Sequence, residues 1–561
     1  MVESNPQDPV TPATKCPPKS RRRWMFRLAA VLLALSFFPV TEVVLRALNV
    51  GRNVNLVIPI EDNLLATTGD FTHQINGMAD LAFYGTTDLS GPETRPFTLP
   101  RPDNTFRIVV VGGSTVIGFP YAPEFAFPRQ LEMQLELQNP GLDVEVLNAG
   151  ITAMNSFAVN ELVAQCFDAK PDLVVIHTGH NEFYGPGGPA STAFQLSPEL
   201  IRQTYHFRRW RSVQIVAALS PPPDNAGEDL LNVLPRQLSI PLNGPVYLQA
   251  RTNYESNLRR MIKACRKSDT PVLLTTVACN LKDQSPLLAE WRNESIDGKV
   301  EWDSLLADAA LLIQQRDYHA ALNALERASD LESEHAMLSY RRGQCYDGLG
   351  DVQQAWAAFS EARDLDACRF RIPSEFHEIA RRVADEHPHC HFLDLTAAMV
   401  ADGYSDPPGY NLFLEHVHYN FEGHHLVGRL FAKFIQENIR SGRWNSDRVA
   451  SSNEMQKSLG FLPEDDLAAT SFAIEVLQTG PFAQTADRQS HIEFLTQRAG
   501  RLFELVPSDR RDVFAELSLN QMSGALPQHL LAEFEERGNK QAVELMRKCW
   551  KLRKPWLRNV P

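Results

Sequence analysis

An apolar strand pattern that ends in a Gly-Gly-Ser turn constrains the fold of this chain most strongly. Residues 106–111 are Phe-Arg-Ile-Val-Val-Val, and Gly112, Gly113 and Ser114 follow directly. A continuous run of β-branched residues broken by glycines is typical of a buried parallel strand that ends in a tight turn. In open α/β sheets, chemistry gathers at the carboxyl ends of the strands. Ser114 is therefore placed where a nucleophile could stand.

Strand and helix patterns alternate along much of the chain. This alternation predicts an α/β domain with a parallel sheet and helices on both faces. The predicted strands are 106–111, 144–147, 173–176, 271–275 and 391–395, and the predicted helices lie near 124–138, 156–168, 247–267, 374–386 and 421–439. Residues 185–240 are rich in proline and glycine, and we expect a long loop there.

A repeat interrupts this α/β pattern. Five positions recur at an offset of 34 residues, which is typical of tetratricopeptide helix pairs. They are Asp317, Ala321, Leu325, Ala328 and Leu331, matched by Asp351, Ala355, Phe359, Ala362 and Leu365. Two units are visible, at about 303–334 and 336–368. Because solenoids usually need at least three repeats, we expect this pair to pack against the α/β domain or to be capped by a diverged helix.

The N-terminus carries a basic flank before an apolar stretch. Lys19, Arg21–Arg23 and Arg27 precede the apolar residues 28–40. Such a flank stays in the cytoplasm while the following segment crosses the membrane. The segment can be interpreted as an uncleaved signal-anchor or as a cleaved signal peptide. The absence of a small-x-small cleavage motif favours the anchor, with Glu42 and Arg46 near the outer interface.

Length and composition complete the predicted organisation. The 561 residues are too many for one ordinary core. The formal net charge of -13 argues against a nucleic-acid binder. The eight scattered cysteines and the alternating histidines at 387–391 lack the spacing of a metal site, so we expect neither metal nor cofactor. We predict a polar basic tail at 1–23, a transmembrane helix at 24–48, a lead-in at 49–104, an α/β domain at 105–300 and 370–440, a helical insertion at 301–369 and a helical C-terminal extension at 441–561.

Further polar residues follow other strands. Gly150 ends the pattern at 144–147, and Asn181 follows the strand at 173–176. A glycine amide and an asparagine side chain can donate to the oxyanion of an acyl-transfer intermediate. Glu415 and His418 stand three residues apart downstream, as an orienting acid and a base would. His416 competes with His418 for the role of base, but it would face the opposite side of an extended segment.

The order of these blocks resembles the SGNH (GDSL-type) hydrolase superfamily, over about 105–300 and 370–440. The segments 112–121 and 179–185 are similar in particular to bacterial members that contain tetratricopeptide repeats. Two departures are Gly113, where many members have aspartate, and Glu415 in place of aspartate. The resemblance implies a three-layer, flavodoxin-like α/β/α domain.

The resemblance also implies an esterase. Ser114 would attack an ester carbonyl, His418 would move the proton, Glu415 would orient His418, and Gly150 and Asn181 would hold the oxyanion. The expected substrate is a small ester or an acylated surface glycan, with water or a sugar hydroxyl as acceptor. The expected location is the inner membrane, single-pass, with a periplasmic catalytic domain. The alternative is an inactive scaffold whose repeats bind a protein partner.

Overall fold

The computed structural model describes residues 19–60, 71–84, 91–191, 196–219, 237–291, 296–516 and 526–556. The chain divides into two units. The first comprises Met1–Arg52 and Arg208–Pro221, and the second comprises Asn53–Phe207 and Pro222–Pro561. The predicted site residues all belong to the second unit.

A five-stranded parallel sheet forms the centre of the second unit. Its strands are β4 (Thr105–Gly112), β5 (Asp143–Gly150), β6 (Leu173–His177), β7 (Val272–Thr275) and β8 (Cys390–Leu393). The order is β5-β4-β6-β7-β8, and every neighbouring pair is parallel. The predicted parallel α/β sheet is thereby confirmed. The strand order reverses beside β4, and in doubly wound sheets ligands bind at such a switch point.

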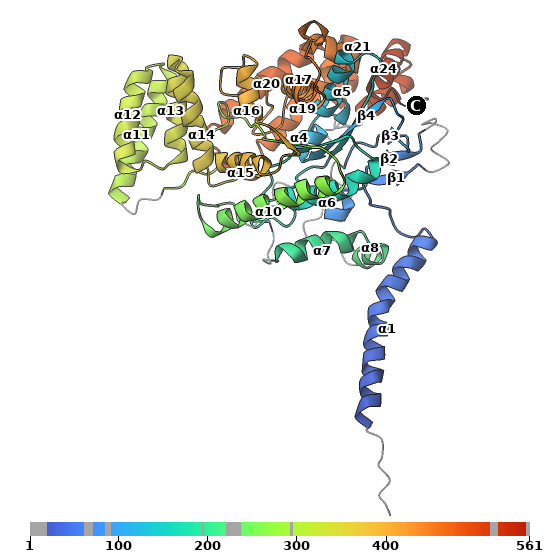
Figure 1. Cartoon of the computed structure of the whole chain (residues 1–561). Helices are drawn as coiled ribbons and strands as arrows, with labels where there is room; N and C mark the ends of the chain where they lie inside the picture. The colour runs from blue at the N-terminus through green and yellow to red at the C-terminus, as the bar shows by residue number, and fades with distance from the viewer. Residues whose placement is uncertain are drawn as a thin grey trace, which may run out of the picture. The chain divides into compact units, whose positions relative to one another are not determined.

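Helices cover both faces of this sheet, as Figure 1 shows. Ile108 and Val110 of β4 pack with α5 (Phe127–Gln138), α16 (Leu395–Ala401) and α17 (Phe421–Phe434). Val109 and Val111 point to the other face, toward α6 (Ser156–Cys166), α10 (Pro245–Lys267) and α15 (Ser374–Asp385). Side chains alternate across a strand, so a strand that is apolar throughout must be covered on both sides. The result is three layers.

Two regions contain elements that the sequence patterns did not indicate. The lead-in forms a small antiparallel sheet of β1 (Val57–Pro59), β2 (His73–Ile75) and β3 (Pro96–Phe97), together with the short helix α3 (Leu81–Tyr84). The expected long loop at 185–240 contains α7 (Pro198–Arg208) and α8 (Arg211–Ala218). The proline run at 221–223 lies outside the described residues.

The insertion consists of helices that pack in sequence order. These are α11 (Ile296–Gln314), α12 (Tyr318–Leu331), α13 (Ala336–Leu349) and α14 (Val352–Leu365). Asp317 and Asp351, which share the repeat offset, cap α12 and α14 by accepting the backbone amides of Ala320 and Gln354. The repeat period therefore has a structural basis, while the tetratricopeptide name stays a prediction.

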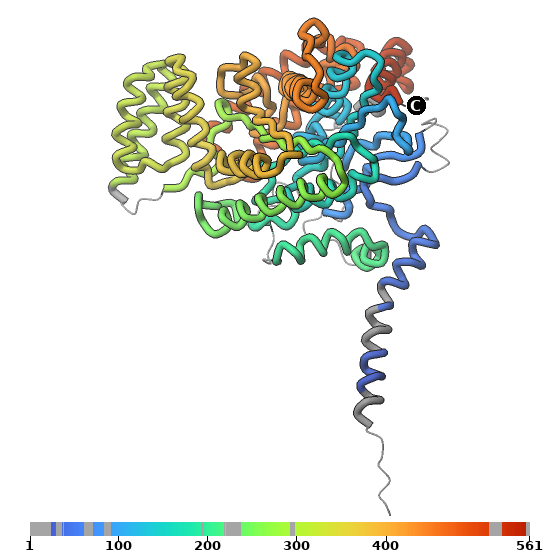
Figure 2. The backbone as a smooth tube through the Cα atoms, in the orientation of Figure 1, coloured from blue at the N-terminus to red at the C-terminus, as the bar shows by residue number. Residues whose placement is uncertain are grey.

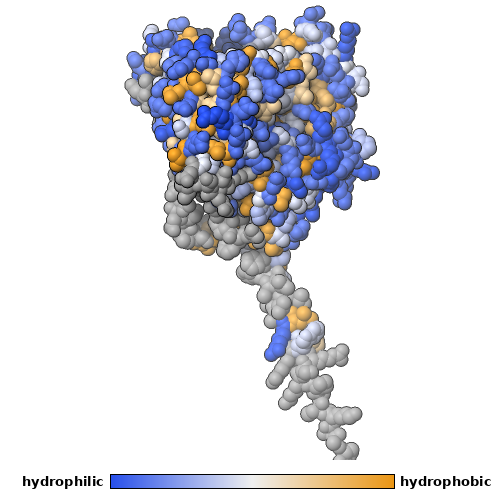
Figure 3. Space-filling view, turned by 90° about the vertical axis from the view of Figure 1, so that its left-hand side faces the viewer, coloured by the Kyte–Doolittle hydropathy of each residue, from blue (hydrophilic) through white to orange (hydrophobic). Residues whose placement is uncertain are grey.

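The insertion exposes apolar side chains singly, among them Val300 and Leu311. In the face that Figure 3 shows, hydrophilic residues dominate and hydrophobic residues are scattered. Isolated apolar residues are ordinary on protein surfaces and do not mark a docking site. The protein partner expected for the repeats stays a prediction.

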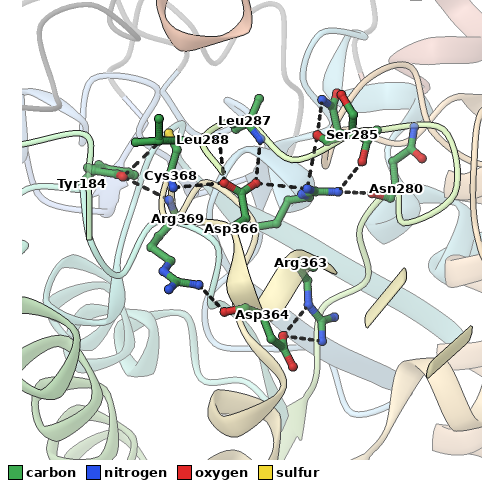
Figure 4. Close-up of polar contacts among 12 residues, drawn as sticks. Tyr184, Asn280, Ser285, Leu287, Leu288, Arg363, Asp364, Asp366, Cys368 and Arg369 are labelled. Carbon is green, nitrogen blue, oxygen red and sulfur yellow. Dashed lines mark hydrogen bonds and ion pairs between the residues drawn. The ribbon is translucent and has the colours of Figure 1, made fainter. Parts of the chain in front are cut away.

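A buried polar junction joins the end of the insertion to the α/β domain (Figure 4). Asp366, at the C-terminus of α14, accepts the backbone amides of Leu287 and Leu288 at 2.8 and 2.9 Å. It also pairs with the guanidinium of Arg371 at 3.1 Å, and this guanidinium donates to the carbonyl of Gln284 at 2.8 Å. The junction explains how two helix pairs are held without a third repeat.

The C-terminal extension packs closely on the domain. Met455, Leu459, Ala473 and Phe482 belong to the same apolar cluster as one face of the sheet. Figure 2 traces this extension in orange to red, and the Gln134 side chain of α5 donates to the carbonyl of Ala450, just before the first of its helices, at 3.1 Å. The helices are α18 (Ser452–Leu459), α19 (Pro463–Val476), α20 (Arg488–Leu505), α21 (Ser508–Glu516), α23 (Leu526–Glu536) and α24 (Lys540–Arg553).

The segment predicted to span the membrane, 24–48, falls on a long helix. These residues lie almost entirely in α1 (Lys19–Ala47), but no helix in the described parts of the chain is both long enough and apolar enough to cross a membrane. Glu42 is buried and accepts the Ser212 amide at the start of α8 at 3.0 Å, while Arg46 pairs with it at 2.7 Å. Glu42 and Arg46 therefore take part in the packing of α1 on α8, and their place near a membrane interface stays a prediction.

Candidate active site

The candidate nucleophile stands on a turn between a strand and a helix. Ser114 is the first residue of α4 (Ser114–Ile117) and follows β4 directly. A Cβ on Gly112 would lie 2.1 Å from the carbonyl oxygen of His177, so only glycine allows this close approach of backbones. Ser114 is 7% exposed, so the residue is buried at the carboxyl end of the sheet.

The loop after α16 brings His418 to this serine. The Leu414 amide donates to the His418 carbonyl at 2.8 Å, which closes a tight turn. The His418 Nε2 atom lies 2.7 Å from the Ser114 Oγ atom. Burial lowers the pKa of His418, so the imidazole is neutral near pH 7 and can accept a proton. The structure thus joins two residues that are 304 positions apart.

Glu415 completes a chain of three side chains. Its Oε1 atom lies 2.5 Å from His418 Nδ1 and accepts the His418 backbone amide at 2.8 Å. A carboxylate at Nδ1 fixes the proton there and leaves Nε2 to accept from Ser114. The extra methylene of glutamate is accommodated because the loop folds back over the carboxylate.

His416, the competing histidine, lies on the other side of Glu415. Its Nδ1 atom hydrogen-bonds the second carboxylate oxygen, Oε2. Its ring packs on Phe482 at a centroid distance of 4.6 Å and on Phe370 at 5.9 Å. Burial holds the pKa of His416 well below its usual range. His416 therefore fixes Glu415, whereas His418 faces the serine.

Asn181 lies beside the nucleophile turn. A Cβ on Gly113 would be 3.0 Å from Asn181 Nδ2, so the amide borders the residue before Ser114. The same Nδ2 group donates to the Met154 carbonyl at 3.1 Å. The side-chain amide is thereby positioned at the switch point of the sheet.

The structure changes the prediction for Gly150. Its backbone amide donates to the Asn148 side chain at 3.0 Å, and a Cβ at this position would lie 2.4 Å from the Ile117 amide nitrogen. The residue is needed for close packing against α4, and its N–H already has an acceptor. It therefore does not fit the predicted role of oxyanion donor.

Ala153 lies in the loop beside the nucleophile turn, and no sequence signal points to it. It is a non-glycine residue in the left-handed region, with φ of 58°. Such a conformation is uncommon for alanine and concentrates at functional sites. Among the described residues, neither the backbone amide of Ala153 nor that of Ser114 has a hydrogen-bond acceptor. The adjoining Met154 lies against Gly113, within 3.9 Å of the position of a Cβ there.

A buried acid braces these loops. Glu182 accepts the Ser156 amide at 2.7 Å and the Ser156 hydroxyl at 2.6 Å, and Asn257 donates to that hydroxyl at 2.9 Å. Burial raises the pKa of Glu182 to about 8. The bonds tie the loop of Asn181 to the start of α6, just after Ala153, so the two candidate oxyanion donors are held together.

Buried histidines give a prediction for stability against pH. Burial lowers the pKa of each below its unfolded value near 6.5, and below pH 6.5 the unfolded chain then binds more protons than the folded chain. Stability is present above pH 6.5 and is lost as pH falls toward the folded pKa values. Buried acids such as Glu182 act in the opposite direction, but they are fewer. The histidines with lowered pKa include His177, His180, His377, His416, His418, His424, His425 and His491.

We expect the apparent melting temperature to be on the order of 10 °C lower at pH 5.0 than at pH 7.5. Scanning calorimetry at one scan rate and ionic strength measures this difference. A variant of the exposed His206, such as His206→Gln, should show the same dependence as the wild type. An equal or higher melting temperature at pH 5.0 would contradict the expected cost of protonating the buried rings.

Comparisons with known proteins give only distant similarity. No protein-family model matches the chain, and no curated protein matches it. Among solved structures, a protein ascribed to the G-D-S-L lipolytic family from Desulfitobacterium hafniense DCB-2 has a TM-score of 0.27 at 11% identity, and the match covers 58% of this chain and 98% of that one. A catalytic mutant of the acetylxylan esterase Axe2 from Geobacillus stearothermophilus has a TM-score of 0.29 at 13% identity, with 61% and 97% covered.

A third solved structure, the acetyl xylan esterase AlAXEase, has a TM-score of 0.26 at 13% identity, with 58% of this chain and 98% of that chain covered. At these identities and TM-scores the similarity establishes neither a family nor a reaction. The function has to be derived from the geometry of the site.

Proposed function

We propose that this protein is a serine esterase of the SGNH type. The observation that carries the proposal is the chain of contacts from Glu415 through His418 to Ser114, with 2.5 and 2.7 Å between the successive polar atoms. A weak nucleophile needs a base within hydrogen-bond reach and a group that orients that base. The presence of both favours catalysis over the inactive scaffold.

The proposed reaction proceeds in two halves. The Ser114 Oγ atom forms a bond to the ester carbonyl carbon while its proton passes to His418 Nε2. The tetrahedral intermediate then collapses, the bond to the leaving alcohol breaks, and His418 returns the proton to the alcohol oxygen. In the second half, water or a sugar hydroxyl attacks the acyl carbon and passes its proton to His418 Nε2. The bond between the acyl carbon and Ser114 Oγ then breaks, His418 returns the proton to Oγ, and the carboxylic acid or the acylated sugar leaves. Glu415 stabilises the imidazolium in both halves.

The negative charge on the intermediate needs fixed donors. The backbone amides of Ser114 and Ala153 and the side-chain amide of Asn181 supply them in this proposal. Preorganised donors in a partly buried site stabilise the oxyanion without reorganising water. Ala153 thus replaces Gly150 in the role that the sequence had suggested for the glycine.

The substrate class in this proposal is a small ester, such as the acyl group of a glycan. A series of p-nitrophenyl esters, with and without added sugar acceptors, tests it. We expect release of p-nitrophenolate from at least one short ester at many times the buffer rate. Formation of acylated sugar would identify a transferase, and hydrolysis alone would identify an esterase. Folded protein that cleaves none of the esters would refute the proposal.

Replacing Asn181 with alanine should lower kcat by about 10²- to 10³-fold with a smaller effect on KM, because the lost donor acts mainly in the transition state. Steady-state kinetics on p-nitrophenyl acetate measure both constants. The exposed Asn438, just after α17, provides the matched control. Asn438→Ala should behave as the wild type. Unchanged kcat in a folded Asn181→Ala protein would exclude this amide from the oxyanion site.

A further inference from the structure

Two aromatic side chains stand beside the candidate base. The ring of Phe119 meets the ring of His418 edge to face, with centroids 5.1 Å apart. The ring of Phe472 meets Phe119 in the same way at 4.8 Å. Both phenylalanines are half-buried, and Phe472 also packs against the core cluster on one face of the sheet. We refer to Phe119 and Phe472 as the aromatic wall.

The two residues of the wall come from opposite ends of the domain sequence. Phe119 follows α4 and lies five positions after the nucleophile. Phe472 lies on α19, within the C-terminal extension that the resemblance to SGNH hydrolases does not cover. The extension therefore contributes a side chain next to the reacting groups.

Helix α19 is fixed where it meets the loop after the nucleophile. The Tyr121 hydroxyl donates to Asp466 at 2.6 Å, and the guanidinium of Arg498 on α20 pairs with the same carboxylate at 2.9 Å. The ring of Phe461 packs on Tyr121 and on Phe125, with centroids 5.9 and 5.0 Å apart. Because these contacts hold both sides of the wall, Phe472 cannot easily swing away from Phe119.

The reacting groups beside the wall have little exposed surface. Ser114 is 7% exposed, and the side chain of His418 is 13% exposed. An acyl group bound to Ser114 Oγ must lie within a few ångströms of His418 and therefore near the ring of Phe119. A methyl group can be buried against an aromatic edge, whereas a longer chain meets Phe472.

We propose that the aromatic wall limits the acyl group to short chains, with Phe472 as the residue that sets the limit. This inference rests on the proposed esterase function. It gives the C-terminal helices a role in specificity, and it places acetyl and similarly small acyl esters as the substrate class. Phe472 acts on the acyl chain through contact and exclusion and takes no part in the proton transfers.

The test compares p-nitrophenyl acetate with p-nitrophenyl octanoate. We expect the wild type to favour acetate by at least about 10-fold in kcat/KM. Phe472→Ala should raise the octanoate-to-acetate ratio by about 10- to 100-fold, because each methylene that a pocket can accept or reject changes specificity by about 10-fold or more. Phe472→Leu, which keeps an apolar side chain for the packing of α19, should give a smaller rise.

Phe503→Ala is the matched control, since Phe503 is a half-exposed phenylalanine on α20 with no recorded contact to Ser114 or His418 among the described residues. Its ratio should equal that of the wild type. Active Phe472→Leu with an unchanged ratio would overturn the inference and leave the esterase proposal intact. A wild type that prefers octanoate would also overturn it. Failure of the wild type to cleave either ester would refute the proposed function, and the inference with it.

Discussion

Ser114→Ala is expected to lower kcat/KM for p-nitrophenyl acetate by at least about 10³-fold, to the level that binding and oxyanion donors alone can support. The reason is geometric, because the Ser114 hydroxyl is within 2.7 Å of the His418 imidazole and no acyl-enzyme forms without it. Steady-state kinetics on purified protein measure the loss. The exposed Ser268 provides the control, and Ser268→Ala should keep wild-type kinetics.

Circular dichroism and the melting temperature of Ser114→Ala should stay close to those of the wild type, since only one oxygen is removed and no backbone contact changes. Activity within about 10-fold of the wild type in this folded variant would show that another residue performs the chemistry. The chain of contacts from Glu415 to Ser114 would then be structural.

The largest expected effect on stability is that of Asp366→Ala. The Asp366 and Arg371 side chains are 3% and 2% exposed, so the substitution leaves a buried guanidinium without its carboxylate. It also removes the acceptor of the Leu287 and Leu288 amides. Breaking one side of a buried pair costs about 3 to 5 kcal/mol, and unpaired amides add to that cost. Urea unfolding, followed by fluorescence, measures the fall in the free energy of unfolding.

The exposed Asp330 on α12 is the matched control, and Asp330→Ala should change the free energy of unfolding by less than about 0.5 kcal/mol. Because Asp366 joins the insertion to the α/β domain, protease cleavage between α14 and α15 should also become faster. A loss below about 1 kcal/mol, with unchanged cleavage, would contradict the importance given to this junction.

Most of the central sheet could be predicted from the sequence because its signals are local. An apolar run such as Val109–Val111, followed by a turn, identifies both a buried strand and the edge of the sheet where it ends. The placement of Ser114, Asn181 and His418 followed from that rule and from the resemblance of the blocks. The 34-residue repeat was visible because Asp317 and Asp351 cap equivalent helices.

Other features depend on geometry that leaves no pattern in the sequence. The role proposed for Ala153 depends on a backbone angle, and an alanine in the sequence does not indicate a positive φ as a glycine would. Strands of two or three residues, such as Pro96–Phe97, are too short to show a period.

Long-range packing is equally hidden from the sequence. The bond between Tyr121 and Asp466 joins residues 345 positions apart, so the packing of the C-terminal extension against the site could not be anticipated. The contact between Glu42 and Ser212 likewise joins residues 170 positions apart.

Covalent labelling of Ser114 tests the central claim most directly. Folded wild-type protein is treated with a fluorophosphonate, digested and mapped by mass spectrometry. We predict one adduct on Ser114, strongly slowed in His418→Ala and absent when the wild type is first unfolded in urea, since the hydroxyl reacts only when His418 accepts its proton. An unlabelled Ser114 in folded wild-type protein, or equal labelling after unfolding, would contradict the claim that these residues form a catalytic unit.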